Sequence, residues 1–489
     1  MTERQKIAHL LRRLGLGAGE LEMRQYEPLG VAGTLNRLLD FEKVDEGFPV
    51  SPWEYCFEEG SNEVYLDPFR TLGHWCLRLL LTKRPLQEKL TLFWHDHFSV
   101  SASKIEFGPM MLKHIDTLRR HAGGKFEDLV QAVAKDPAMI RFLDTDASIK
   151  GAPNENFARE LMELYTLGIG HYTERDIQEA ARAFTGWGIR YLVFEPGGEK
   201  IQQTARDSMK SGKPMVAFCK TPDLHDDGEK TVLGQKGRFD GEDVVRLLCS
   251  RPETARHLSR KLWEWFAYPN PENAVVEALA ATFTKSSGDI RAVVRTLAER
   301  PEFWSEKCYR TMPKSPVDFT VGITRQFGVN DFLMTMRGKV EDPMKPIAKP
   351  VRDISGFLGI LMSQQGMLLL YPPDVGGWEW GEKWITSQTM TMRIRLGEQF
   401  MGVGQADKGL ANLIATRVKQ NRNPQSSAEV VEGLLEIFDG ELDGAKKAEL
   451  ARACEKAGGV PALDKPETAS EMLGAVLRLL FATPEFQMG

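Results

Sequence analysis

The sequence predicts a mainly α-helical protein: a large multi-helix globular fold with a small irregular or β-hairpin insert around residues 188–240. Three observations lead to this prediction. Hydrophobic residues make up 42% and charged residues 27% of the 489 residues, as in folded proteins with a sizeable core. Apolar residues recur at helical spacing along most of the chain. The insert differs, because it is rich in Gly, Lys and Thr and holds short β-prone pieces at 191–194 and 215–218.

The predicted helices follow one another from residue 69 onward. The first segment, 69–98, is interrupted at Pro85, because proline lacks the N–H that a helix interior needs. The others span 108–122, 125–135, 154–168, 173–186, 241–268, 272–300, 316–328, 353–368, 389–402, 405–420, 427–438 and 467–482. We expect three regions, 1–187, 188–240 and 241–489, joined in one continuous multi-lobed domain.

A short pattern that ends in proline occurs four times, at 129–137, 244–252, 293–301 and 476–484. Apolar residues at helical spacing precede each proline, and a glutamate follows the last three prolines. Proline ends one helix, and the glutamate favours the first turn of the next, where negative charge is stabilising. The pattern predicts helix–proline–helix corners that serve packing. Its irregular spacing excludes a solenoid.

Charge and hydropathy exclude several classes of protein. The 63 basic and 68 acidic residues give a net charge of −5 without a long basic run, so we expect no nucleic-acid partner. No apolar run reaches the length needed to cross a bilayer, so we expect no membrane segment. The first residues are too charged for a signal peptide, which predicts a cytoplasmic protein. The six cysteines form no close pair, and Cys76 and Cys249 are expected to be buried thiols.

Several segments resemble a known family. They are FWHDHFSVS (93–101), NENFARELMELYTLG (154–168), DIQEAARAFTGW (176–187), HDDGEKTVLG (225–234), RKLWEWF (260–266) and YPPDVGGWEWGEKWI (371–385). With the two chain ends, they make the sequence similar to the bacterial family named domain of unknown function 1800. The resemblance implies a helical bacterial protein. It also implies gene neighbours of a sulfatase-like family and, for many members, export from the cell.

The helix expected over 154–168 concentrates polar side chains on one face. At about 100° per residue, Asn156, Arg159, Glu160 and Glu163 fall within one arc. One interpretation is a solvated amphipathic face with an Arg159–Glu163 pair at i, i+4. The other is a site, since Glu160 and Glu163 at i, i+3 could offer two carboxylates to one metal ion.

Two histidines flank an aspartate in the WHDHF segment. His95 and His97 would project to the same side of an extended chain and could share a metal ion. On a helix they would point in nearly opposite directions. A buried, hydrogen-bonded histidine pair is the alternative to metal binding or proton transfer.

Two loops complete the set of candidates. HDDG (225–228) carries His225 and Asp227 beside a glycine, which suits either a cation or an Asx turn; it is too short for an EF-hand. The loop from residue 371 to 384 combines Asp374 with several tryptophans, Trp378 among them. Such a loop can stack on a flat ligand or plug a core.

The leading functional hypothesis is an enzyme that depends on a divalent metal and acts on an unknown polar or anionic substrate. In this hypothesis His95, His97, Glu160 and Glu163 bind the metal. The sequence lacks the nucleotide-binding, zinc-protease and serine-hydrolase motifs GxGxxG, P-loop, HExxH and GxSxG.

The remaining candidates would serve the substrate. Catalytic roles are expected for Asn156, Arg159, Glu160, His225 and Asp227, and substrate contacts for Asp374 and Trp378. The alternative hypothesis is a non-catalytic helical scaffold that binds a protein partner, with a sulfatase-like protein suggested by the resemblance. A third interpretation treats the polar motifs as internal salt-bridge networks.

Overall fold

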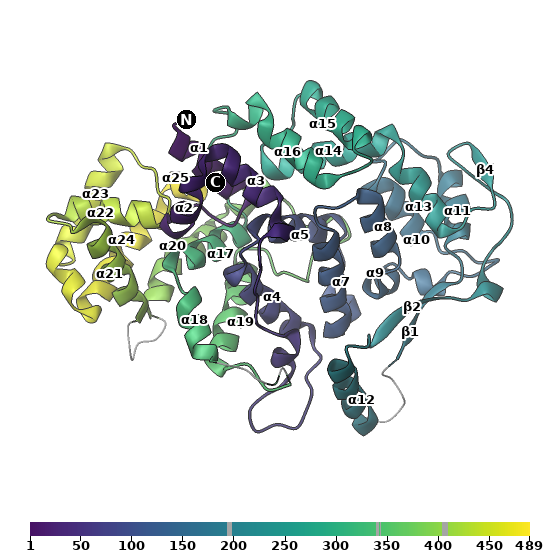
Figure 1. The fold of residues 1–489 in the computed structure, drawn as a ribbon, viewed down its shortest axis with the longest axis horizontal. Coiled ribbons are helices and arrows are strands. Elements are labelled where there is room, and N and C mark those ends of the chain that lie inside the picture. The colour runs from purple at the N-terminus through teal and green to yellow at the C-terminus, as the bar shows by residue number, and fades with distance from the viewer. Residues whose placement is uncertain (193–197, 339–341, 343, 403–408) are drawn as a thin grey trace.

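The predicted fold class is confirmed: helices dominate the computed structural model, which describes residues 1–192, 198–338, 342, 344–402 and 409–489 (Figure 1). The first third contains α1 (Glu3–Leu14), α2 (Glu20–Tyr26), α3 (Gly30–Leu39), α4 (Pro68–Leu81), α5 (Pro85–His97), α6 (Ala102–Ile105), α7 (Gly108–His121), α8 (Phe126–Ala134), α9 (Pro137–Phe142) and α10 (Asn156–Glu160). α10 continues directly into a π-helix, Leu161–Tyr165.

The rest of the chain continues as helices on both sides of the insert. It contains α11 (Glu174–Ala183), α12 (Gly198–Ser211), α13 (Gly241–Cys249), α14 (Pro252–Phe266), α15 (Asn273–Lys285), α16 (Ile290–Glu299), α17 (Pro316–Phe327), α18 (Asn330–Arg337) and α19 (Lys349–Gln364). It ends with α20 (Ser387–Gly402), α21 (Gly409–Arg422), α22 (Ser427–Ile437), α23 (Gly444–Lys456), α24 (Pro466–Ala482) and α25 (Pro484–Gln487). None of the described helices combines the length and apolar character that a membrane span needs.

The insert contains a helix that the sequence did not predict. β1 (Trp187–Tyr191) pairs antiparallel with β2 (Val216–Lys220), and α12 connects them (Figure 1). The sequence favoured an irregular segment because α12 is made largely of polar residues; the described side chains that it buries are Ala205, Ser208 and Met209. A second pair, β3 (Lys230–Val232) and β4 (Gln235–Gly237), is a short hairpin. Residues 193 and 194 of the first predicted β piece lie outside the described residues.

The four proline corners are present as predicted. Pro137, Pro252, Pro301 and Pro484 each occupy the first turn of the helix that follows. Acidic residues stand in the first turn after the last three prolines, where they face the positive end of the helix dipole. These corners turn the chain and keep consecutive helices packed on one core.

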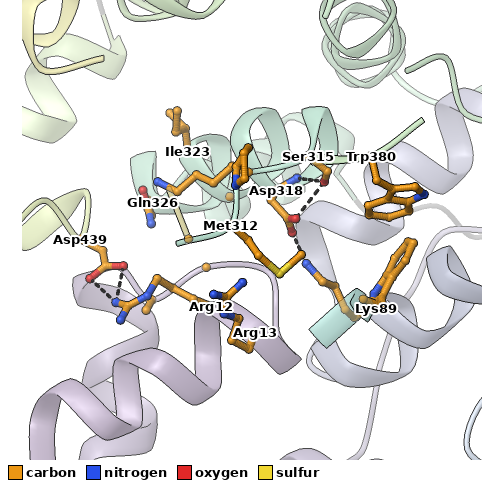
Figure 2. Close-up of a pocket in the computed structure, with 17 residues that line it drawn as sticks. Arg12, Arg13, Lys89, Met312, Ser315, Asp318, Ile323, Gln326, Trp380 and Asp439 are labelled. Atoms are coloured by element: carbon orange, nitrogen blue, oxygen red, sulfur yellow. Dashed lines mark hydrogen bonds and ion pairs between the residues drawn. The ribbon is translucent and has the colours of Figure 1, made fainter. Parts of the chain in front are cut away.

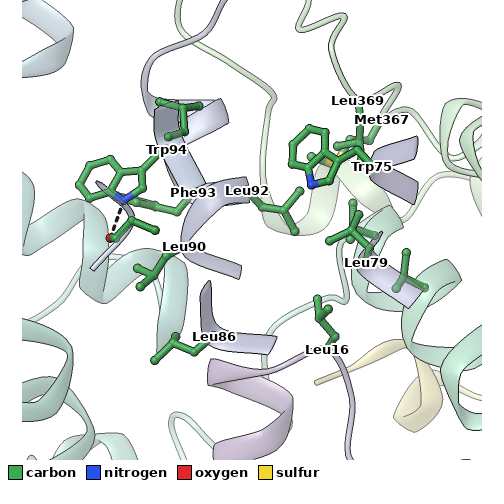
Figure 3. Close-up of a cluster of buried hydrophobic side chains, with 14 of the residues drawn as sticks. Leu16, Trp75, Leu79, Leu86, Leu90, Leu92, Phe93, Trp94, Met367 and Leu369 are labelled. Atoms are coloured by element: carbon green, nitrogen blue, oxygen red, sulfur yellow. Dashed lines mark hydrogen bonds between the residues drawn. The ribbon is translucent and has the colours of Figure 1, made fainter. Parts of the chain in front are cut away.

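Helix α5 runs through the hydrophobic core. Figure 3 shows Leu92 of this helix directed toward Trp75 and Leu79 of α4, while Leu86, Leu90 and Trp94 lie on the other side of α5. The Trp94 indole donates a hydrogen bond to the Ala122 carbonyl at 2.9 Å. Nearly every residue of α5 is buried, the polar end included. The WHDHF segment is therefore held deep in the protein, which decides what its side chains can do.

Candidate functional site

The WHDHF segment forms the last turn of α5, so His95 and His97 are helical and not extended. Residues i and i+2 of a helix lie about 200° apart, and the two imidazoles accordingly have different neighbours. His95 Nε2 accepts a hydrogen bond from the Leu370 amide at 3.1 Å. His97 Nε2 donates to the Tyr165 carbonyl at 3.1 Å. Burial lowers the pKa of His95 to about 3 and that of His97 well below its usual value, so both are neutral.

Asp96, between the two histidines, faces the aromatic loop. Its Oδ1 accepts a hydrogen bond from the Trp378 amide at 2.9 Å, and the residue is only 6% exposed. Burial raises the pKa of Asp96 to about 6, although the Trp378 N–H, the Lys261 charge and the Trp380 side chain act in the opposite direction. An aspartate with this pKa changes its charge close to neutral pH, unlike an exposed one.

Lys261 of α14 is close enough to Asp96 for the charge of each residue to shift the pKa of the other. Its side chain is partly exposed, and among the described residues it has no hydrogen bond or ion pair. Burial lowers the Lys261 pKa, while the charges of Asp96 and Glu264 raise it. Asp96 and Lys261 therefore influence each other electrostatically without forming a close salt bridge.

A third histidine completes this cluster. His257 lies one helical turn before Lys261, and its Nε2 donates to the Leu164 carbonyl of the π-helix at 3.1 Å. Burial lowers the His257 pKa to about 4, and the Lys261 charge lowers it further. Gly168 leaves room for this ring, since a Cβ there would lie 3.0 Å from His257 Nδ1. π-Helical turns often occur at functional sites, and this one places its backbone against both His97 and His257.

The polar face predicted on 154–168 is divided by the same π-helix. Arg159 pairs with Glu174 at 2.8 Å and with Glu155 at 3.1 Å. The expected Arg159–Glu163 pair was wrong: Glu163 instead accepts a hydrogen bond from the Tyr172 hydroxyl at 2.6 Å. The physical reason is that a π-helix has more residues per turn, so an i, i+4 offset no longer aligns the two side chains.

Glu160 is half-buried, and Asn156 is exposed. Burial and the neighbouring Glu163 raise the Glu160 pKa, which Arg159 lowers. The charge of Glu160 also acts on the buried Tyr165, whose carbonyl is the partner of His97. The structure thus connects Glu160 to His97 through Tyr165.

The predicted metal ligands do not assemble into a recognisable metal set. Across residues 1–192, 198–338, 342, 344–402 and 409–489, no group of three or more His, Cys, Asp or Glu could hold a metal ion. The four predicted ligands all lie within these ranges, and the Nε2 atoms of both histidines are already hydrogen-bonded to backbone. This finding gives the metal hypothesis no geometric support, and it stays a prediction.

The HDDG loop makes its polar contacts with α11 and the residues that follow it. Asp226 pairs with Arg182 at 2.7 Å, and its Oδ1 accepts the Gly228 amide at 2.9 Å, which is the Asx turn that the sequence allowed. His225 Nδ1 donates to the Thr185 carbonyl at 2.9 Å. Asp227 is largely exposed and lies 3.2 Å from the Lys150 ammonium.

The aromatic loop packs against the core while leaving one edge open. Trp378 and Trp384 are buried, as expected if the loop plugs the core. Trp380 is partly exposed and packs edge-on against Trp265, with ring centroids 4.0 Å apart. Asp374 is exposed, and its Oδ1 accepts the Gly376 amide at 2.7 Å.

Comparison with known proteins identifies the family. The model of the family described as "Protein of unknown function (DUF1800)" matches residues 9–488, nearly the whole chain. The chain belongs to the DUF1800 family. No curated protein and no solved structure matches it.

The DUF1800 segments that carry the resemblance meet at this cluster. Asp96 comes from WHDHF, Lys261 from RKLWEWF, the Trp378 amide from the aromatic loop, and the carbonyl partners of His97 and His257 from NENFARELMELYTLG. The sequence analysis missed Asp96, Lys261 and His257 as site residues. The available signal was their position within these segments, since each lies in or directly beside a motif that carried the resemblance.

Proposed function

We propose that this DUF1800 protein is an enzyme in which Asp96 and Lys261 transfer protons to and from a polar or anionic substrate. One observation carries the proposal: Lys261 is partly exposed and unpaired within the described part of the chain, yet it interacts electrostatically with the buried Asp96 carboxylate where several family segments meet. Such a lysine keeps a free ammonium or amine that can reach a bound molecule.

The protonation of the pair suits acid–base catalysis. General acids and bases work best when their pKa lies near the operating pH. Burial raises the pKa of Asp96 to about 6 and lowers that of Lys261, so both values move toward neutrality. In its neutral form Lys261 would accept a proton from the substrate or from an attacking water, and the resulting ammonium would return it to a leaving group. Asp96 would stabilise that ammonium.

Other buried ion pairs of the protein provide an internal comparison. Glu88 binds Arg119 at 2.6 Å and the Trp75 indole at 3.0 Å. Glu54 binds Arg337 at 2.7 Å. In these pairs the nitrogen and oxygen atoms lie within hydrogen-bond distance, as expected for groups that fix how helices pack. Lys261 lacks a contact of this kind among the described residues, which favours a catalytic role over a structural one.

The metal-dependent version and the scaffold alternative remain separate predictions. A divalent ion held by His95, His97, Glu160 and Glu163 would need those side chains to rearrange, because they form no group among the described residues that could hold a metal ion. A scaffold for a sulfatase-like protein would need an exposed apolar patch, whereas Ile169, 77% exposed four residues after the π-helix, is a single apolar side chain. The cytoplasmic location and the absence of a nucleic-acid partner also remain predictions.

The experiment is a turnover screen of purified protein against chromogenic esters, amides, phosphoesters and glycosides. For any substrate that is turned over, we expect Lys261→Met and Asp96→Asn to reduce kcat at least about a hundredfold, the usual contribution of a general acid or base. Lys285→Met on α15 and Glu379→Gln in the aromatic loop are matched controls, because both side chains are exposed. Turnover that survives both site variants with an intact fold would contradict the proposal.

A further inference from the structure

A second polar site lies in a pocket between α1, α5 and α17. Figure 2 shows Arg12 and Arg13 of α1 on one side and Lys89 of α5 on the other, with Met312 between them. The pocket has a cavity volume of about 50 Å³ and is partly open to solvent. Lys314 and Gly489 also line it, so segments from both halves of the chain contribute.

Positive charge exceeds negative charge around this pocket. Its lining includes four cationic side chains, Arg12, Arg13, Lys89 and Lys314, but two carboxylates, Asp318 and Asp439. Lys89 forms an ion pair with Asp318, and Arg12 lies 2.9 Å from Asp439.

Asp439 is shared with a further cation. Arg310 also approaches it at 2.9 Å, so one carboxylate serves two guanidinium groups. Among the described residues, no carboxylate pairs with Arg13 or Lys314. Arg13 and Lys314 therefore lack an ion-pair partner among the described side chains.

Arg13 is one of these cations, and it is only 5% exposed. Its Nη2 donates to the Cys308 carbonyl, while its Nε has no hydrogen-bond partner in the part of the chain that the structure describes. Burial lowers the Arg13 pKa, and the neighbouring Arg12 lowers it as well. Burying a charged group without full hydrogen bonding is costly, and such donors in native proteins usually meet a ligand or water.

Lys314 is the second cation. Its Nζ donates to the Phe486 carbonyl at 2.8 Å and lies 4.2 Å from the centre of the Phe486 ring. Burial, helped by the charges of Arg310, Arg12 and Arg393 and opposed by Asp439, lowers the Lys314 pKa to about 7. A lysine ammonium has three N–H groups, so Lys314 can donate further hydrogen bonds beyond its contacts with the Phe486 carbonyl and ring.

We propose that this pocket binds a small oxyanion, the carboxylate or phosphate group of a ligand, between Arg13 and Lys314. A buried anion would satisfy the free donors and compensate the excess positive charge at once. Met312, Ile323 and Trp265 add apolar walls, and the cavity volume of about 50 Å³ suits a small anionic group. The inference goes beyond the proposed proton transfer, because the pocket needs neither Asp96 nor Lys261 to bind an anion.

The pocket nevertheless borders the Asp96–Lys261 pair. Trp265 and Trp380 line it, and Trp265 lies one helical turn after Lys261 on α14. Trp380 also contributes to the electrostatic environment of Asp96. A ligand bound through its anionic group would thus lie near Asp96 and Lys261. Trp265 and Trp380 would separate the ligand from these two residues.

The test is isothermal titration of the full-length protein with inorganic phosphate and, separately, with sodium acetate at fixed chloride and ionic strength. We expect one saturable site for at least one of these anions. Lys314→Met and Arg13→Gln should each weaken binding at least about tenfold, the worth of one charge-assisted hydrogen bond. Lys285→Met on α15 is the control and should bind like the wild type, as should Asp96→Asn.

The pH dependence of acetate binding and the comparison of the two anions give further information about the site. Acetate keeps its charge between about pH 6 and pH 8, so weaker acetate binding at the higher pH would report loss of the Lys314 proton. Saturable binding of phosphate alone, or of acetate alone, would identify which oxyanion group the pocket accepts. The proposal is overturned if neither anion shows saturable binding to the wild type, or if Lys314→Met and Arg13→Gln bind as the wild type does. Because Asp96→Asn is expected to bind normally, failure of the proton-transfer proposal would leave this result unchanged.

Discussion

Gly377 and Asp96 are in contact so close that no other residue fits at position 377. A Cβ on Gly377 would lie 2.4 Å from Asp96 Oδ1 and 2.8 Å from the Asp96 carbonyl oxygen. The glycine also has a φ of +89°, a backbone conformation that side chains disfavour. This contact allows the neighbouring Trp378 amide to reach the carboxylate at 2.9 Å. The aromatic loop therefore fixes the position of the proposed acid.

Substitution of this glycine tests the contact. We expect Gly377→Ala to lower the free energy of unfolding by about 3 kcal/mol or more, since it adds a steric clash to backbone strain. Gly381→Ala is the matched control, because Gly381 has a φ of +66° but no atom within 4 Å of the place that a Cβ would occupy. The free energy of unfolding of Gly381→Ala should fall by about 1 kcal/mol, from backbone strain alone. Equal losses in urea unfolding would show that the loop does not press against Asp96.

Acid should destabilise the protein through its buried histidines. The pKa of His95 is about 3 in the folded protein and about 6.5 when unfolded, so below pH 6.5 the unfolded chain binds a proton that the folded chain does not. Stability therefore falls as the pH falls, by about 2 kcal/mol from His95 alone between about pH 7.5 and pH 5. His9 and His74, with lowered pKa values of about 2 and 3, act in the same direction.

Asp96 opposes this trend. Its pKa of about 6 lies above the unfolded value, so the folded state gains relative stability as the pH falls through 6. We expect His95→Gln, whose side-chain oxygen can still accept the Leu370 amide, to reduce the loss between pH 7.5 and pH 5 by about 2 kcal/mol in urea unfolding. His171→Gln, at an exposed position, should leave the loss unchanged. An unchanged loss in His95→Gln would mean that His95 is protonated in the folded protein.

Buried and exposed ion pairs should differ in their contribution to stability. Glu88→Gln removes the carboxylate that Arg119 and the Trp75 indole share in the core, and should cost about 3–5 kcal/mol. Glu174→Gln removes an exposed partner of Arg159, and we expect little change in the unfolding midpoint. Thermal unfolding of the two variants makes the comparison. A large effect of Glu174→Gln would indicate that the Arg159 network is structural.

Elemental analysis tests the metal hypothesis. We expect His97→Ala and Glu160→Ala to have the same metal content as the wild type after incubation with zinc, manganese, iron or calcium, since the His97 Nε2 atom already donates to the Tyr165 carbonyl. Inductively coupled plasma mass spectrometry gives the content directly. Near-stoichiometric metal that is lost in both variants would restore the shared metal site.

The sequence predicted the helices well where apolar periodicity and proline agreed. α4 and α5 lie within the predicted 69–98 segment apart from one residue, with the break at Pro85, because proline and a continuous apolar face act locally. α12 was missed, since its residues are largely polar and it lies in an insert rich in Gly, Lys and Thr. The π-helix at 161–165 was missed too, because its geometry comes from tertiary packing and not from a local pattern.

The candidate site was predicted in part. His95 and His97 were predicted as candidates. The directions in which their imidazoles point depend on whether α5 extends through both residues, and the local sequence did not decide this. Lys261 and Asp96 are far apart in the sequence, and their electrostatic interaction depends on the tertiary fold, in which α5 contacts α14 through Phe93 and Trp265. The aromatic segment contained Trp378 and Asp374, yet the group that contacts Asp96 is the Trp378 backbone amide, which no side-chain motif can indicate.

The most direct test of the central claim is the titration of Lys261 itself. Trace labelling with acetic anhydride between about pH 6 and pH 11, followed by mass spectrometry, measures the amine pKa without a substrate. We expect Lys261 to be labelled with a midpoint below the ordinary lysine value, and with a still lower midpoint in Asp96→Asn, because the Asp96 charge raises the Lys261 pKa. Glu379→Gln, in the same loop, should leave the midpoint unchanged. A Lys261 that resists labelling at every pH, or whose midpoint is ordinary and insensitive to Asp96→Asn, would contradict the account.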